Sequence, residues 1–279
     1  MNRFVRKSRI ARVLHAASGL AFITAVSTTV SAQWPKYPTP GVPRLPTGEP
    51  NLHAPAPHAP DGKPDLSGIW ENERSDPKQP VDSSRPPLAN FGDLGAGFKD
   101  GLPLTPWGAE IVKKRVAENS KGNPDAHCLP MGIVQFHTHP FPRKMFQTPT
   151  AVLIVYEANS WVRQILTDGR PLPDNDPDPW WNGYSVGTWD ADTLVVKTIG
   201  FRDEGWLDIR GNPLTDRARM TERFRRIDYG HLEIEITVED PKAYTTPWTV
   251  LVKQRLMVDT ELIEFVCNEN ERSTQYFDK

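Results

Sequence analysis

The chain has 279 residues and a formal net charge of −2, from 33 Lys and Arg against 35 Asp and Glu. Five of the basic residues and none of the acidic ones lie in residues 1–32, so the rest of the chain carries 33 less 5, or 28, basic residues and a net charge of −7. This charge argues against nucleic acid and anionic lipid as partners, because both require a basic surface. The remaining length suits one domain of barrel size preceded by an arm.

Residues 1–32 have the pattern of an export signal. A basic start is followed by an apolar stretch over residues 13–26 and by the small residues Val30-Ser31-Ala32 before Gln33. The apolar run is short and interrupted by Ser and Thr, so we expect a cleaved signal peptide and no membrane span after cleavage. An uncleaved anchor is the alternative. The expected location is the periplasm or the exterior of the cell.

The two cysteines, Cys128 and Cys267, both lie in the exported part. An even pair in an oxidising compartment predicts one disulfide, which would tie the middle of the chain to its last strand. Two free buried thiols are the alternative. A catalytic cysteine is disfavoured, because near Cys128 only His127 would lower the pKa of the thiol.

Residues 33–64 form a proline-rich arm, which cannot be helix or internal strand and is expected to be an extended arm or a disordered tether. His53 and His58 lie in it, and we interpret them as incidental, because the arm offers too few further metal ligands. Residues 65–279 are predicted to form a single domain, with a loop and helix insertion at about 76–124. Thr105-Pro106 marks the start of its one short helix.

The rest of the chain predicts an antiparallel meander, organised around a hairpin whose turn is Asp190-Ala191-Asp192. The expected fold is mainly β, an antiparallel lipocalin-like β-barrel, with a β-sandwich as the alternative. The predicted strands cover residues 65–70, 144–148, 151–157, 161–167, 184–189, 193–199, 219–227, 232–239, 248–257 and 262–268.

Alternation of apolar and polar residues predicts which side chains face inward. In Leu232–Glu239 the even positions are apolar, and the same rule places Glu222 and Gln254 on inward faces. A buried carboxylate is costly unless it is paired or used. Glu222 is therefore either a structural partner of Arg163, Arg170 or Arg226, or an acid/base group with a raised pKa.

Two short motifs offer further candidate residues. His137 and His139 form a His-x-His, for which a metal site, a pocket-lining base and a plain surface loop are the alternatives; Pro140 and Pro142 favour a loop. Asp168-Gly-Arg170 is either a capped turn or a rim that places Arg170 against an anionic ligand. Nucleotide, flavin, serine-hydrolase and zincin motifs are absent from the sequence, so we expect no cofactor.

Several motifs together resemble a large family of exported, mostly uncharacterised bacterial proteins, over about Asp65 to Asn270. The motifs are Asp168-Gly-Arg170, Gly183-Tyr-Ser-Val-Gly-Thr-Trp189, Asp192-Thr-Leu-Val-Val196, Glu222-Arg-Phe-Arg-Arg226, Asp240-Pro-Lys-Ala-Tyr-Thr-Thr-Pro-Trp248 and Cys267-Asn-Glu-Asn270. This resemblance implies no particular chemistry. The Gly68-Ile-Trp70 entry strand is also similar to that of lipocalin-like barrels, which implies a cavity for one small ligand.

We therefore expect the protein to bind a small apolar or aromatic compound, and to transform it by cofactor-free acid/base catalysis as a lyase, isomerase or hydrolase. A non-catalytic carrier and an envelope interaction module are the alternatives. The candidate catalytic residues are Glu222, His137, His139, Arg170 and Asp168. The candidate substrate-binding residues are Arg163, Trp181, Tyr184, Trp189, Trp206, Tyr244, Trp248 and Gln254. The oligomeric state is not indicated by the sequence.

Overall fold

The structure is a computed structural model that describes residues 38–73, 82–173 and 178–269. The description below concerns the unit that begins at Pro38. The predicted export signal and the start of the proline-rich arm lie outside the described residues. Over the described part of the chain, no helix combines the length and the apolar character needed to cross a membrane.

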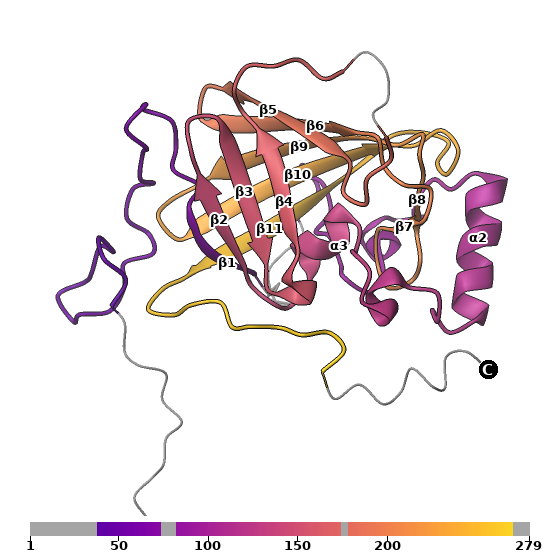
Figure 1. Cartoon of the computed structure of the whole chain (residues 1–279), viewed down its shortest axis with the longest axis horizontal. Helices are drawn as coiled ribbons and strands as arrows, with labels where there is room; N and C mark the ends of the chain where they lie inside the picture. The colour runs from indigo at the N-terminus through magenta and orange to yellow at the C-terminus, as the bar shows by residue number, and fades with distance from the viewer. Residues whose placement is uncertain (1–37, 74–81, 174–177, 270–279) are drawn as a thin grey trace, which may run out of the picture. The chain divides into compact units, whose positions relative to one another are not determined.

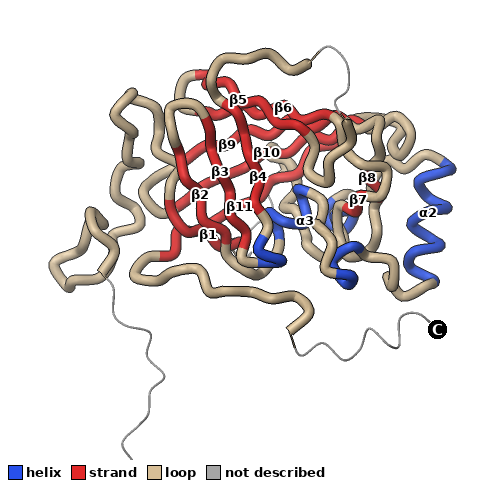
Figure 2. Tube along the Cα trace, in the orientation of Figure 1, coloured by secondary structure: helices blue, strands red, loops and turns tan. Residues whose placement is uncertain are grey.

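Within the described residues, nine strands close into a β-barrel (Figures 1 and 2), which confirms the lipocalin-like barrel and excludes the sandwich. Strand β1 pairs with β11 on one side and with β2 on the other, so the sheet has no free edge. In their order around the barrel, the strands are β1 (Gly68–Asn72), β11 (Trp248–Met257), β10 (His231–Glu239), β9 (Arg219–Arg226), β6 (Thr193–Ile199), β5 (Tyr184–Asp190), β4 (Val162–Leu166), β3 (Ala151–Tyr156) and β2 (Arg143–Gln147).

One strand pair departs from the predicted antiparallel meander. Strands β4 and β5 are parallel, and their register contains only Ile165 opposite Ser185 and Leu166 opposite Val186. The other neighbouring strands of the barrel pair antiparallel. Because β4 and β5 run in the same direction, the chain must cross back between them, and the two strands share a short seam.

Alternation along β9 and β10 places one face of each strand in the core, as predicted. On β9 the side chains of Met220, Glu222 and Phe224 are buried, and on β11 Gln254 is buried as well. The four apolar residues at even positions of β10 are fully buried. The barrel core is therefore mainly apolar, with a few polar side chains inside it.

The predicted strand over residues 262–268 does not form. These residues lie in coil and a turn after β11. The prediction was wrong because β1 already pairs with β11 and β2, so the closed barrel has no edge to which a further strand could add.

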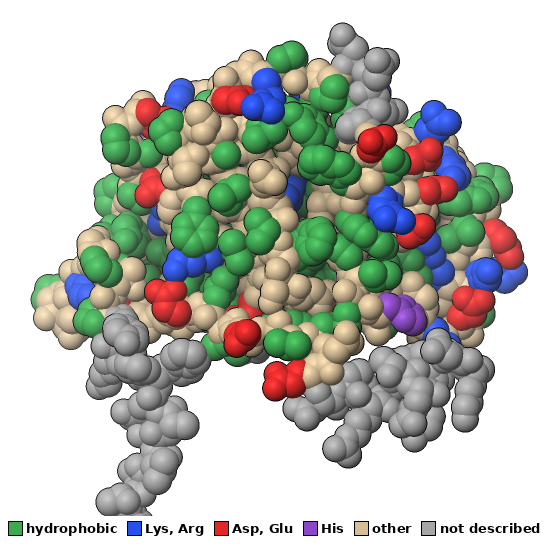
Figure 3. Space-filling model, in the orientation of Figure 1, with side chains coloured by type: hydrophobic (Ala, Val, Ile, Leu, Met, Phe, Trp, Pro, Cys, Tyr) green, Lys and Arg blue, Asp and Glu red, His purple; other side chains and the backbone are tan. Residues whose placement is uncertain are grey.

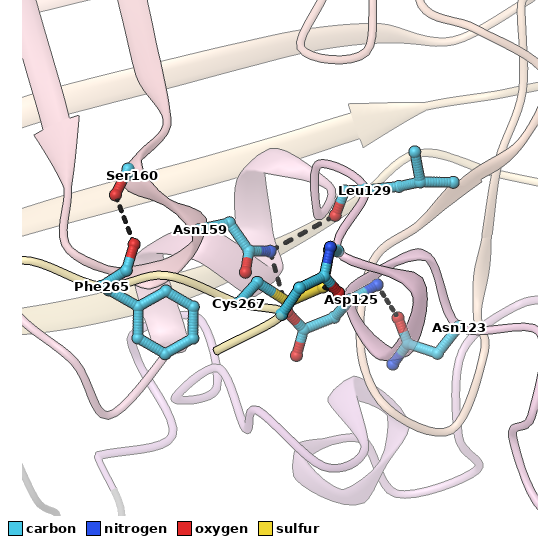
Figure 4. Close-up of a disulfide and its surroundings, with 9 residues drawn as sticks. Asn123, Asp125, Leu129, Asn159, Ser160, Phe265 and Cys267 are labelled. Atoms are coloured by element: carbon cyan, nitrogen blue, oxygen red, sulfur yellow. Dashed lines mark hydrogen bonds between the residues drawn. A yellow bond between two sulfur atoms is a disulfide. The ribbon is translucent and has the colours of Figure 1, made fainter. Parts of the chain in front are cut away.

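The predicted disulfide joins Cys128 to Cys267, although Cys267 lies in this terminal segment and not in a strand. Figure 4 shows its surroundings: Asn159 donates to Asp125 at 3.0 Å, and Ser160 Oγ donates to the carbonyl oxygen of Phe265 at 2.7 Å. The bond joins residues 139 positions apart, which corresponds to roughly 4 to 5 kcal/mol in the chain-entropy model.

Helix α2 (Pro106–Ala117) begins where the sequence predicted, with Thr105 Oγ1 accepting from the amide of Gly108 at 3.1 Å. It packs through Gly108 and Val112, and a Cβ at Gly108 would meet the carbonyl oxygen of Ala243 at 2.4 Å. The remaining short elements are η1 (Leu94–Gly97), η2 (Pro124–His127), η3 (Ala158–Ser160), β7 (Gly205–Trp206) and β8 (Pro213–Leu214).

The segment around His137 is a short buried helix, α3 (Ile133–Thr138), and not the predicted surface loop. Each of its six residues is buried. The two following prolines mark the end of this helix instead of preventing it, because a proline disrupts only the turn that precedes it. His137 and His139 therefore do not lie on one face of a strand.

The described part of the arm, residues 38–64, contains neither helix nor strand and lies against the barrel. The amide of Gly230 donates to the carbonyl oxygen of Leu52 at 2.7 Å, and that of Tyr229 donates to Ala54 at 2.8 Å. A Cβ at Gly230 would approach Leu52 Cβ to 2.5 Å, so glycine permits this close contact. Near its start, Thr39 and Arg44 bind the carboxylate of Asp259.

Candidate functional site

A buried ion cluster joins β9, β4 and α3. The carboxylate of Glu222 accepts from Arg163 through both of its oxygens, with a distance of 2.9 Å between Nη1 and Oε1. His137 Nε2 donates to the same Oε1 at 3.0 Å. The side chains of Glu222, Arg163 and His137 are almost fully buried. The sequence suggested Arg163, Arg170 or Arg226 as the partner of Glu222, and in the structure the partner is Arg163.

Arg163 also ties three neighbouring strands together. Its Nη2 donates to Ser185 Oγ on β5 at 3.1 Å and to Thr198 Oγ1 on β6 at 3.2 Å, and these two hydroxyls are 2.9 Å apart. A buried guanidinium requires such partners for most of its donors. The cluster therefore connects the two sides of the β4–β5 seam through side chains where the backbone pairing is short.

The electrostatics of this cluster favour a fixed ion pair. Burial alone would raise the pKa of Glu222, but Arg163 and His137 lower it to about 2. Burial is also the main reason why the pKa of His137 is lowered. At neutral pH Glu222 is thus ionised and accepts a hydrogen bond from a neutral His137, and this arrangement favours the structural interpretation of Glu222 over the catalytic one.

Two further buried side chains, Arg143 on β2 and Gln254 on β11, hold the end of α3. Arg143 donates to the carbonyl oxygens of His137, His139 and Phe141, the latter two at 3.1 Å, and Gln254 Nε2 lies 3.4 Å from the carbonyl oxygen of His137. Our sequence prediction missed Arg143. The alternation of buried Arg143 and Met145 along β2 was the signal that could have identified it.

His139 has a different set of contacts from His137. Its Nδ1 accepts from the amide of Phe141 at 3.1 Å, and its ring meets the edge of Phe91 at a centroid distance of 5.0 Å. Burial, with a smaller contribution from Arg143, lowers the pKa of His139 to about 4. This side chain is therefore neutral near pH 7 and packs as an aromatic group.

Asp168 and Arg170 form an exposed pair in the turn after β4. Arg170 Nε donates to both carboxylate oxygens of Asp168 at 2.9 and 3.0 Å, and its Nη1 donates to the hydroxyl of Tyr184 at 3.3 Å. The hydrogen bond from Arg170 is the main reason why the pKa of Asp168 is lowered. Arg170 also lines a surface groove of about 510 Å³, and none of Glu222, Arg163 and His137 lines this groove.

Four of the aromatic candidates do not form one ligand-binding wall. Trp206 is buried beneath Arg115, whose guanidinium lies 4.4 Å from its ring. Tyr244 and Trp248 are buried against each other at a centroid distance of 5.3 Å, and Trp189 packs on the core. Tyr244, Trp248 and Trp189 therefore pack in or against the barrel core, whereas Trp206 lines, together with Trp181, a second surface groove of about 410 Å³.

A groove of about 380 Å³ lies along the β4–β5 seam. It is lined by Trp161, Val162, Arg163, Gln164, Pro179, Trp180, Trp181, Asn182, Gly183 and Arg202. Of the candidate substrate-binding residues, Arg163 and Trp181 are therefore brought together here. Figure 3 shows the molecule from the side on which β3 and β4 face the viewer, with hydrophobic side chains around a hollow near the middle of this face.

Three side chains of this groove contain buried polar atoms that lack a partner among the described residues. Asn182 is 6% exposed; its Nδ2 donates to the carbonyl oxygen of Met131 at 3.3 Å, which leaves Oδ1 without a hydrogen bond. Trp161 Nε1 and Arg163 Nε are also buried and unpaired. Neither Asn182 nor Trp161 was predicted from the sequence, because their positions depend on the parallel seam. The residues that line the groove therefore hold one unpaired acceptor and two unpaired donors just beneath its surface, beside aromatic rings.

Metal-ligating side chains come together elsewhere. Within the described residues, one group of three such side chains is close enough to hold an ion, and it consists of His53, Asp228 and His231. Neither His137 nor His139 belongs to it.

Comparison with protein-family models, with curated proteins and with solved structures finds no match for this chain. The resemblance to a family of exported bacterial proteins therefore stays a prediction, and the function must be argued from the site itself.

Proposed function

We propose that this protein binds a small hydroxylated aromatic molecule, such as a phenol, in the groove at the β4–β5 seam. The observation that carries the proposal is the buried, unpaired Oδ1 of Asn182 in the wall of a groove that also contains Trp161, Trp180 and Trp181. The ligand ring would stack on indole surface, and its hydroxyl would donate to Asn182.

The physical reason is that both kinds of surface gain from such a ligand. A buried polar atom without a partner costs about 1 to 3 kcal/mol, and a ligand hydroxyl would remove this cost. An aromatic pair contributes about 0.5 to 1.5 kcal/mol beyond the burial of its area. Arg202 lies 4.8 Å from the ring centre of Trp181 and adds positive charge, which favours ligands that also carry a carboxylate.

Binding without catalysis is the function that the site supports best. Acid/base chemistry near neutral pH requires a group with a pKa near that pH, whereas the pKa of Glu222 is about 2 and its carboxylate is paired. The candidate acid/base residues His137 and His139 are neutral and packed. The proposal is therefore a carrier, and the expected lyase, isomerase or hydrolase activity is not part of it.

The proposed location is the periplasm or the cell exterior. The disulfide between Cys128 and Cys267 supports it, because such bonds persist mainly in oxidising compartments. The signal-like pattern of residues 1–32 is the second support.

Tryptophan fluorescence tests the proposal. Titration with phenols and hydroxylated aromatic acids should quench the parent protein in a saturable way, and Trp180→Ala should weaken binding at least ten-fold because it removes a ring from the groove. Asn182→Leu should have a similar effect, and Asn182→Asp, which keeps an acceptor, should bind better than Asn182→Leu.

The control is Trp107→Ala, which removes another exposed tryptophan from helix α2, outside the groove. Its affinity should equal that of the parent. The proposal would be wrong if no ligand of the panel bound, which would favour the interaction module, or if Trp180→Ala and Trp107→Ala bound equally well.

A further inference from the structure

His53 of the arm lies over the turn between β9 and β10. The residues on both sides of it, Leu52 and Ala54, accept backbone hydrogen bonds from Gly230 and Tyr229 of that turn. The position of the His53 backbone is therefore fixed from both sides, even though its side chain is 82% exposed.

In this position His53 meets two side chains of the turn. Asp228 Oδ2 accepts from His53 Nδ1 at 3.1 Å, and Asp228 Oδ1 accepts from His231 Nδ1 at 2.6 Å. The two imidazole rings are stacked, with centroids 4.9 Å apart and planes 19° apart. Both Nδ1 atoms thus face one carboxylate, and one ligand atom from each residue lies within 4.8 Å of the others.

Two imidazole nitrogens and one carboxylate oxygen are a ligand set that binds zinc and other divalent first-row metals. In a tetrahedral zinc site, ligand atoms lie about 3.3 Å apart, given metal–ligand distances near 2.0 to 2.2 Å. The carboxylate of Asp228 meets the two Nδ1 atoms through different oxygens, Oδ1 at 2.6 Å and Oδ2 at 3.1 Å, so a small rotation of these side chains is needed to set three ligand atoms around one ion. In a neutral histidine the proton can move from Nδ1 to Nε2 through solvent, and Nδ1 is then able to bind a metal ion.

We propose that His53, Asp228 and His231 bind one divalent transition-metal ion, such as Zn²⁺, with the remaining coordination position open to solvent. Such an ion would fasten the proline-rich arm to the β9–β10 turn. The site is independent of the aromatic groove. The sequence pattern did not indicate it, because His53 and Asp228 are 175 residues apart.

Zinc binding to the full chain, without an affinity tag and stripped of metal by a chelator, tests the site. Calorimetry should show one Zn²⁺ per chain, and His53→Ala and His231→Ala should each weaken binding at least ten-fold. His58→Ala, in the same arm but outside the group, should bind like the parent. Absence of stoichiometric binding, or parent-like affinity in His53→Ala, would overturn the proposal.

Two further readouts separate this site from adventitious binding to other histidines. Co²⁺ in place of zinc should give visible absorption bands in the parent and lose them in His53→Ala. Zinc should also slow proteolysis of residues 38–64 in the parent but not in His53→Ala, because only the parent can link the arm to the turn. Equal protection in both proteins would refute the link between arm and turn.

Discussion

Two ion pairs of the same chemistry, Arg163–Glu222 and Arg170–Asp168, have their arginines close together in the chain, on β4 and in the turn after it, but lie in opposite environments. The side chains of the first pair are 2% and 0% exposed, and those of the second are 47% and 26% exposed. In the sequence all four residues were candidates for the same catalytic or anion-binding site. In the structure the two pairs contact different residues and do not form one site.

The difference shows that burial, more than residue type, decides what such a pair does. In water an exposed pair gains little, because each charge is already solvated and salt screens the attraction. In the core, each charge depends on the other, since neither can return to water without unfolding. The buried pair therefore specifies how β4 meets β9, whereas the exposed pair shapes a turn.

The largest expected effect comes from removing one buried charge. Arg163→Met should lower the free energy of unfolding by about 3 to 5 kcal/mol, because Glu222 would stay buried without its cation. Denaturant unfolding, followed by tryptophan fluorescence, measures this change.

The double variant Arg163→Met with Glu222→Met is the matched control for the buried charge. It should recover most of the lost stability, because well-packed apolar residues can replace a buried pair at little cost. Equal destabilisation of the single and double variants would show that the lost packing, and not the unpaired charge, is responsible.

The next largest effect concerns pH. The pKa of Glu222 is lowered from 4.5 to about 2, so its contribution is complete above about pH 4.5 and is lost as the pH falls toward 2. By linkage this amounts to about 3 kcal/mol. Unfolding experiments between pH 6 and pH 2 should show this loss, and Glu222→Gln should have a flatter profile below pH 4.5. A profile of unchanged slope in Glu222→Gln would contradict the assignment.

Stability should also fall in a second pH range, which lies above the range in which Glu222 takes up its proton. The pKa of His139 is lowered from 6.5 to about 4, so this group favours the unfolded state as the pH falls from 6.5 to 4. His139→Phe should flatten this part of the profile, and unfolding experiments between pH 7 and pH 4 measure the change; an unchanged slope would contradict the assignment to His139.

The smallest effect is expected for the exposed pair. Arg170→Ala should leave the unfolding midpoint almost unchanged, and any difference from the parent should vanish at high salt. Thermal unfolding in low and high salt measures it. A large, salt-independent loss of stability would mean that Arg170 acts through more than its contacts with Asp168 and Tyr184.

Patterns with a short range were predictable from the sequence. The period of two along β9 and β10 identified the inward face of Glu222, and the alternation along β11 did the same for Gln254. The Thr105-Pro106 signal located helix α2, and two cysteines in a chain with a signal-like start predicted the disulfide. In each case the information lies within a few residues or in a simple count.

Features that depend on contacts between distant segments were not predictable in the same way. The parallel pairing of β4 with β5 depends on how the chain crosses between them, and it creates the groove around Asn182. Helix α3 is too short to show a helical period, so its burial depends on the surrounding barrel. His53 acquires its partners only because the arm folds back on the β9–β10 turn.

The disulfide also determines how the protein would respond to mechanical force. A pull on the two ends would pass from the N-terminal part to Cys128, across the sulfur atoms to Cys267, and on to the C-terminus. All strands from β2 to β11 lie between the two cysteines and would carry no load along their backbone, whereas β1 lies in the loaded part. Strand β1 would therefore be pulled from the barrel while the other eight remained enclosed in a covalent loop.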